Sequence, residues 1–349
     1  MRRRPIIALA LLTSVVPLAA QFRRAGPLGQ DTQPSPSATP NAPPKKPEPV
    51  ITDDQVIKVE TALVNLYFTA RSSHGGYMAN LRQEDLDVYE DGKLQTIKKF
   101  GHETDQPLTL GLLVDVSKSQ ERLIEDERNA SARFFEQVLR PKDMAFLLSF
   151  GIDSELIQDS TNSPRILEQA LREVRMNAGA PSPTPTTVDL PMRGTVLYDA
   201  VYLAANEKMR QEVGRKALVL LTDGDDYGSK VRPAEAIEAA QRADSIVYVI
   251  LYEDPRFTNP MYGGRSGEGE MKHLTEDTGG HTFRVSRSTP LSAIYDQLQE
   301  ELRSQYVLTY TPTNEKRDGG FRKIELRLKN RKDVKILVRK GYYASPAGE

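Results

Sequence analysis

The sequence contains no cysteine among its 349 residues. Without thiols the chain has no disulfide, no lipid-modified cysteine, no thiol nucleophile and neither an iron–sulfur nor a cysteine zinc site. Its four histidines show neither metal-binding spacing nor a paired nucleophile, so we expect them to form no catalytic or metal site. Stability must therefore come from apolar burial and bound metal.

A strong net charge is also missing. The 47 Lys and Arg residues balance 48 Asp and Glu residues, which leaves a formal net charge of −1. Such a chain has no global field that attracts nucleic acid or an anionic membrane, and no long basic run compensates for this. We therefore expect no nucleic-acid partner. The length fits about two domains, one large and one small.

The first residues follow the plan of a signal peptide. Three arginines at positions 2–4 precede an apolar stretch at 6–12, and small residues stand before Gln21. The apolar part is shorter than the roughly 20 residues that a membrane span needs. We predict that residues 1–20 are a signal peptide and that the protein is exported, to the periplasm, the cell surface or the medium. An uncleaved membrane anchor is the alternative.

Residues 21–54 are rich in proline, with eight prolines between positions 23 and 49. A segment of proline among Ser, Thr, Ala and Gln cannot form a hydrophobic core. We therefore predict a disordered linker that separates the folded part from the signal peptide or the membrane.

Strand patterns flank the middle of the chain. Residues 55–101 alternate apolar and polar positions, and the turn at Asp91-Gly92 between apolar runs indicates a hairpin. Residues 305–344 contain three further strand patterns. Each group alone would leave sheet edges and apolar faces exposed, so we predict one β-sandwich built from both. Two independent small β modules are the alternative.

Residues 107–304 alternate apolar runs with helical patterns, which predicts an α/β fold: a doubly wound, mostly parallel, Rossmann-like sheet. This domain would be inserted in, or flanked by, the β-sandwich. The apolar runs are typical of strands that are covered on both faces, and they lie at Leu108–Val114, Ala145–Phe150, Ala217–Leu221 and Ile246–Leu251. Helices are expected at 121–139, 164–174, 197–211, 233–243, 271–278 and 291–304.

Oxygen-bearing side chains follow two of these strands. The first strand ends in Asp115, with Ser117 and Ser119 at alternate positions after it, and the third is followed by Asp223. Ligands in such folds bind beyond the carboxyl ends of the strands. With Thr195 at the start of a helix, five hard oxygen donors converge if the two strands are neighbours, and such donors suit a divalent cation.

This spacing resembles the metal-ion-dependent adhesion site of von Willebrand factor type A domains, and the resemblance covers roughly residues 107–304. The wider chain also resembles a family of exported bacterial proteins related to these domains and first noticed in Acidobacteria. The segments that carry that wider likeness are Asp85–Gly92, Gly214–Asp226 and Leu302–Tyr343.

The resemblance implies a ligand set and a cation. Ser117, Ser119 and Thr195 would bind the metal directly, and Asp115 and Asp223 directly or through water. Mg²⁺ is implied first, with Ca²⁺ or Mn²⁺ as substitutes. One departure is Lys118, where many bacterial members carry glycine; since this is not a ligand position, we expect metal binding to survive.

The remaining coordination position implies a function. It would accept an acidic group of a partner, so we expect a non-enzymatic adhesion or interaction module that binds a protein ligand through Asp or Glu. A small-molecule substrate is not expected. A scaffold that the metal only stabilises and a metal-dependent hydrolase are the alternatives, and the latter would need a base that the sequence does not reveal.

Overall fold

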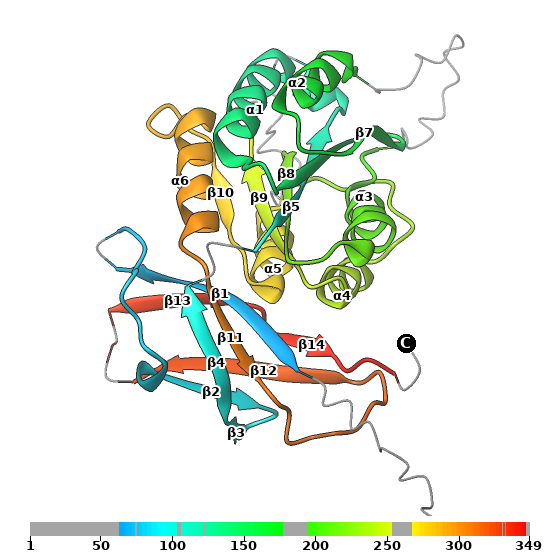
Figure 1. The fold of residues 1–349 in the computed structure, drawn as a ribbon. Coiled ribbons are helices and arrows are strands. Elements are labelled where there is room, and N and C mark those ends of the chain that lie inside the picture. The colour runs from blue at the N-terminus through cyan, green and yellow to red at the C-terminus, as the bar shows by residue number, and fades with distance from the viewer. Residues whose placement is uncertain are drawn as a thin grey trace, which may run out of the picture. The chain divides into compact units, whose positions relative to one another are not determined.

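The computed structural model describes residues 63–346, apart from residues 74, 103–105, 122, 177–193, 253–266, 330 and 332. The predicted signal peptide, the predicted linker and the start of the predicted N-terminal strand segment lie outside these residues. The described residues belong to one compact unit, Val59–Glu349. Their strands form one six-stranded sheet and two four-stranded sheets (Figure 1).

The six-stranded sheet is the centre of the α/β domain. Its strands, in sheet order, are β10 (Thr282–Arg284), β9 (Ser245–Leu251), β8 (Arg215–Thr222), β5 (Leu108–Asp115), β6 (Met144–Phe150) and β7 (Ser154–Thr161). Neighbours are parallel except for β6 and β7. Every residue of β5 and β9 is buried, as unbroken apolar runs require. The predicted α/β fold is therefore confirmed.

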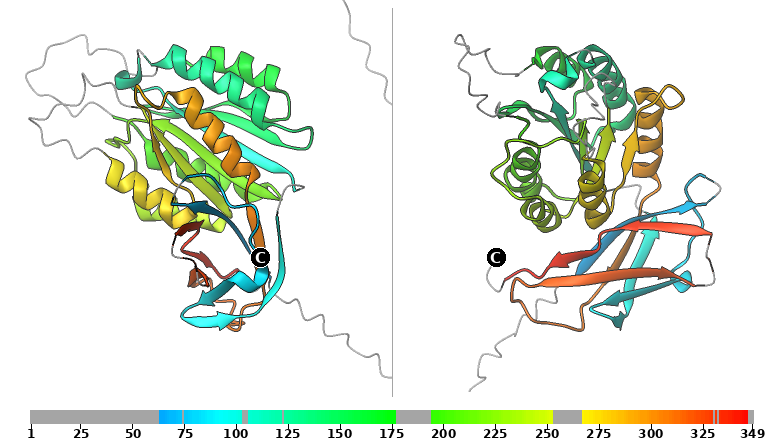
Figure 2. Two further views of the ribbon diagram at one scale, coloured as in Figure 1. Left: turned by 90° about the vertical axis from the view of Figure 1, so that its left-hand side faces the viewer. Right: turned by 180° about the vertical axis from the view of Figure 1, so that it is seen from behind.

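Two groups of helices cover the two faces of this sheet (Figure 2). One apolar cluster includes side chains of α1 (Ile124–Val138), α2 (Pro164–Glu173) and α6 (Leu291–Arg303). The other includes those of α3 (Leu197–Leu203), α4 (Pro233–Arg242) and α5 (Glu268–Thr278). Leu112 of β5 belongs to the first cluster and Leu113 to the second, because successive strand residues point to opposite faces.

Helix ends agree closely with the sequence patterns. Helix α2 begins at Pro164 after Ser163, although the Ser163 side chain makes no capping hydrogen bond. Helix α5 begins at Glu268, three residues before the predicted start at 271. The helical segment predicted at 197–211 is regular only to Leu203 and continues as a π turn and a 3-10 turn. Among the described helices, none combines the length and the apolar character that crossing a membrane requires.

Both ends of the chain contribute to each four-stranded sheet. One sheet has the order β13 (Val334–Val338), β1 (Val64–Ser72), β11 (Tyr306–Tyr310) and β4 (Ile97–His102). The other has the order β14 (Gly341–Tyr343), β12 (Phe321–Leu328), β2 (Leu86–Glu90) and β3 (Lys93–Gln95). Side chains of both sheets form a single apolar cluster that includes Phe68, Val88, Leu308 and Ile324.

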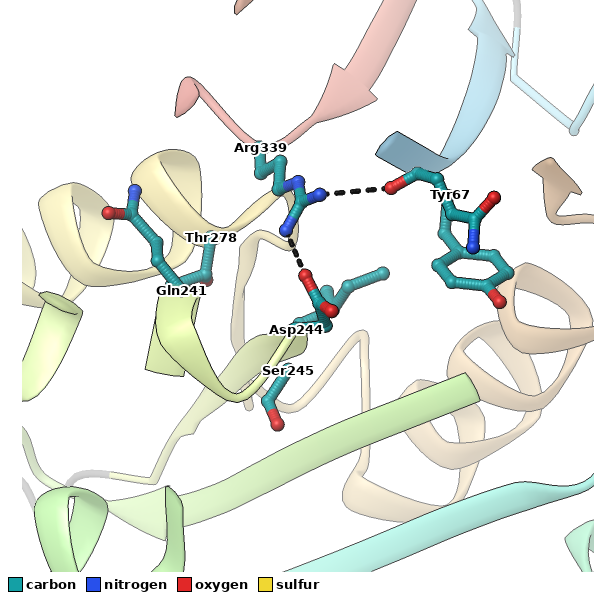
Figure 3. Close-up of a pocket in the computed structure, with 8 residues that line it drawn as sticks. Tyr67, Gln241, Asp244, Ser245, Thr278 and Arg339 are labelled. Atoms are coloured by element: carbon teal, nitrogen blue, oxygen red, sulfur yellow. Dashed lines mark hydrogen bonds and ion pairs between the residues drawn. The ribbon is translucent and has the colours of Figure 1, made fainter. Parts of the chain in front are cut away.

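Ion pairs and hydrogen bonds join these sheets to the α/β domain. Arg339 forms an ion pair with Asp244 in the turn between α4 and β9, and it donates to the Asn65 carbonyl oxygen at 2.9 Å (Figure 3). On the other side of the joint, the Tyr77 hydroxyl donates to the buried Glu301 carboxylate at 2.7 Å. The cavity drawn in Figure 3 has a volume of about 10 Å³, which is room for about one water molecule. This small cavity therefore has no room for a ligand larger than water.

Candidate metal centre

The loop that follows β5 holds three of the predicted ligands together. Asp115 ends β5 and is fully buried. Its Oδ1 accepts a hydrogen bond from the Ser117 backbone N–H at 2.9 Å, so the loop turns back onto the carboxylate. The Ser117 and Ser119 hydroxyl oxygens lie 2.9 Å apart. Asp115, Ser117 and Ser119 thus lie together in the structure.

The neighbouring strand β8 contributes the second half of the site. Strands β5 and β8 pair in parallel, with Val114 opposite Leu221, so their carboxyl ends lie side by side. The Thr222 hydroxyl donates to Asp115 Oδ2 at 2.7 Å, and this hydrogen bond fixes the orientation of the Asp115 carboxylate. Asp223 follows directly, and its Oδ1 accepts from the Asp225 backbone N–H at 3.1 Å. The positioning role of Thr222 depends on strand adjacency, and the sequence motif alone does not indicate it.

Thr195 reaches the same edge of the sheet from the loop before α3. It is buried, and its carbonyl oxygen accepts from the Tyr227 backbone N–H at 3.1 Å. Behind it, Asp226 accepts from the Leu197 backbone N–H at 2.9 Å and from the Ser229 hydroxyl. A carboxylate at this place satisfies a free N–H at the start of the helix. Asp226 therefore holds the segment that carries Thr195.

Electrostatic repulsion marks the centre of the site. Burial and, after it, the negative charge of Asp223 together raise the pKa of Asp115 from its usual 3.8 to about 7, against hydrogen bonds from Ser117 and Thr222. A buried carboxylate whose ionisation a neighbouring negative charge opposes is stabilised by a cation between the two groups. The residues present therefore fit a divalent cation.

A further acid lies under the site. Glu127 of α1 is 1% exposed, and neither of its carboxyl oxygens has a hydrogen-bond partner among the described residues. Burial raises its pKa well above the usual 4.5, and the charges of Asp115 and Asp223 add to the effect. The sequence pattern does not distinguish Glu127 from the many acidic residues that lie on the solvated faces of helices.

The donor set consists of oxygen atoms only. Among the described residues, no group of three or more His, Asp or Glu side chains is placed to hold a metal. The candidate centre instead combines two carboxylates with the hydroxyls of Ser117, Ser119 and Thr195. Hard oxygen donors of this kind suit Mg²⁺, Ca²⁺ or Mn²⁺.

No known family profile matches the chain, and no curated protein matches it significantly. Solved structures resemble its fold. BatB from Bacteroides thetaiotaomicron is 18% identical with a TM-score of 0.42, and the match covers 56% of this chain and 100% of BatB. The vWF domain of the type V pili tip protein Mfa5 from Porphyromonas gingivalis is 12% identical with a TM-score of 0.41, covering 56% and 95%. The SpRpn10 VWA domain is 12% identical with a TM-score of 0.38, covering 55% and 95%.

These likenesses concern the fold alone. One of these structures is named as a VWA domain and another as a vWF domain. The link to the exported family first noticed in Acidobacteria stays a prediction.

Proposed function

We propose that this protein holds one divalent cation, Mg²⁺ first, at Asp115, Ser117, Ser119, Thr195 and Asp223, and uses it to bind an acidic group of a protein partner. The observation that carries the proposal is the fully buried Asp115 carboxylate, which two hydrogen bonds orient toward the loop and which Asp223 opposes electrostatically. A bound cation would supply the positive charge that this pair lacks.

The balance of charge supports capture of a further anion. The proposed donors carry two negative charges, from Asp115 and Asp223, and the other three are neutral hydroxyls. A divalent cation held by so few carboxylates retains affinity for another hard oxygen ligand. A carboxylate of Asp or Glu on a partner is such a ligand. The exposed Lys118 beside the site adds to the attraction for an acidic group.

A binding role fits the surroundings better than a hydrolytic one. A metal-dependent hydrolase needs a base within reach of water and substrate. Besides the proposed ligand Asp115, Glu127 has a raised pKa under the influence of the site's charges, and it is enclosed by the protein. His281 lies elsewhere, with its Nδ1 3.2 Å from Glu301 at the joint with the β sheets. Neither residue is placed to activate water for an external substrate.

The cellular setting follows from the chain's start. We propose export to the bacterial envelope or the medium, because the Arg-rich start and short apolar stretch are those of a signal peptide. With the proline-rich segment as a linker, the α/β domain would reach away from any uncleaved membrane anchor.

The test combines metal titration with partner capture. Calorimetric titration with Mg²⁺ should give one site in the wild type and none in Asp115→Ala. Asp296→Ala serves as the control, because Asp296 is exposed on α6, and it should bind Mg²⁺ like the wild type. Wild type that binds no divalent cation at millimolar concentration would refute the proposal.

A pull-down from envelope extracts separates binding from scaffolding. Any cation that binds only the folded state raises stability, by about 2.7 kcal/mol at 100 times its Kd, so a melting shift alone does not distinguish the two roles. If the metal bridges to a partner, chelator and Asp115→Ala both release that partner while Asp296→Ala retains it. Retention in chelator would favour the scaffold.

A further inference from the structure

An exposed aromatic side chain stands at the rim of the candidate metal centre. Tyr227 is 72% exposed, which is unusual among the large hydrophobic side chains of the described residues. Its backbone N–H donates to the Thr195 carbonyl oxygen at 3.1 Å. Tyr227 therefore lies beside one of the five proposed ligands. Metal binding as proposed above makes no use of this ring.

Close packing against Gly194 fixes the position of the Tyr227 Cβ. A Cβ added to Gly194 would lie 2.3 Å from the Tyr227 Cβ, and one added to Gly228 would lie 2.8 Å from the Gly194 carbonyl oxygen. Contacts this short leave no room for any side chain at these two positions. The two glycines thus allow the Thr195 loop to approach the loop after β8, which carries Tyr227.

A hydrogen bond holds the other end of the side chain. The Tyr227 hydroxyl donates to Asp225 Oδ2 at 3.2 Å, and Asp225 is itself tied to Asp223 through its backbone N–H. The ring is therefore held both at its backbone and at its hydroxyl. An exposed aromatic side chain that is ordered in advance loses little conformational entropy on binding, which is why tyrosine is frequent at recognition surfaces.

We propose that Tyr227 forms the second contact of the partner site and selects an acidic residue that is followed by a large apolar or aromatic residue. This inference rests on the proposed function, because the partner's carboxylate must first bind the cation. The hydroxyl of Tyr227 is engaged by Asp225, so the ring offers its apolar faces. A partner side chain that covers the ring removes apolar surface from water while its neighbour binds the metal.

Three labelled peptides test this selection by fluorescence polarisation with millimolar Mg²⁺ present. They have the sequences Gly-Gly-Glu-Phe-Gly-Gly, Gly-Gly-Glu-Gly-Gly-Gly and Gly-Gly-Gln-Phe-Gly-Gly. Full-length wild type should bind the Glu-Phe peptide about fivefold or more tightly than the Glu-Gly peptide, the loss typical of removing one aromatic anchor. The Gln-Phe peptide should bind weakest, because a neutral amide is a poorer ligand for the cation.

Matched variants assign the effect to the ring. Tyr227→Ala should lower the affinity for the Glu-Phe peptide to that for the Glu-Gly peptide, whereas Tyr227→Phe should keep the preference. Val213→Ala removes a side chain that is 76% exposed just before β8, at the opposite end of that strand, and should behave as wild type. All three should bind Mg²⁺ with wild-type affinity, because the substitutions keep the backbone N–H that contacts Thr195, and the Tyr227 hydroxyl bonds to Asp225, which is not a proposed ligand.

The outcomes separate the two proposals. If both Glu peptides bind in a Mg²⁺-dependent way and Tyr227→Ala leaves their ratio unchanged, the selection by Tyr227 is wrong and the proposed function stands. If the wild type shows no preference between them, the selection is wrong as well. If no peptide binds in a Mg²⁺-dependent way, carboxylate capture fails, and the selection fails with it.

Discussion

The affinity for Mg²⁺ should fall steeply as the pH drops below 7. In the metal-free protein, burial and then the charge of Asp223 raise the pKa of Asp115 to about 7. A protonated carboxyl is not a ligand, so the metal must displace this proton. Above pH 7 the carboxylate is already ionised and the cost disappears. Acid therefore weakens binding and alkali restores it.

The expected size follows from this pKa. With one proton to displace, the apparent affinity falls about tenfold for each pH unit below the pKa, thus about tenfold at pH 6 and about a hundredfold at pH 5. An aspartate with the usual pKa of 3.8 would lose less than about 10% of its affinity at pH 5 by the same relation. This difference in affinity is large enough to show whether the pKa of Asp115 is raised.

Calorimetric Mg²⁺ titrations between pH 5 and 8 measure this dependence. Pairs of buffers with different ionisation enthalpies count the protons released, and the count should approach one per Mg²⁺ below pH 6. Thr222→Val removes the hydroxyl that donates to Asp115 Oδ2, so it should move the midpoint to higher pH. An affinity that stays constant from pH 5 to 8 would refute the reasoning about Asp115.

Three other variants give separate tests. Thr195→Ala removes one neutral oxygen and should weaken Mg²⁺ binding in calorimetry less than Asp223→Ala does, yet still reduce capture of a partner. Glu127→Gln should flatten the pH dependence of stability: the folded state keeps its proton above the usual pKa of 4.5, so wild-type unfolding free energy falls as pH rises, by up to about 1.4 kcal/mol per unit. Urea titrations at pH 5 and 8 would contradict this if the unfolding free energy of both proteins changed by the same amount between the two pH values. Deleting residues 305–349 removes the partner strands of β1 and β2, so limited proteolysis should cut residues 64–102 readily; unchanged resistance there would contradict a shared β structure.

Long apolar runs made the central strands predictable. Strands β5, β6, β8 and β9 are buried on both faces, and their runs appear in the sequence almost residue for residue. The edge strand β7 was missed because most of its residues are partly or fully exposed, so it lacks such a run. Strand β10 was missed because it has three residues, too few for any period to show.

The ends of the chain show the limit of local patterns. Alternation and the Asp91-Gly92 turn indicated strands, and both turn residues have positive φ, as that hairpin turn requires. The pairing of β1 with β11 and β13 joins residues more than 230 positions apart. No local pattern encodes such a register, because it is decided by which apolar faces can be covered together.

The candidate site divides in the same way. The spacing of Asp115, Ser117 and Ser119 is local, so the sequence by itself determined which oxygen atoms one loop can turn to one side. Only the tertiary structure decided that Asp115 is fully buried, that Thr222 orients it and that Tyr227 stands beside Thr195. These contacts arise from the pairing of β5 with β8 and from close backbone packing at Gly194. A carboxyl's pKa and a ring's exposure depend on what surrounds them in space, and distant parts of the chain supply those surroundings.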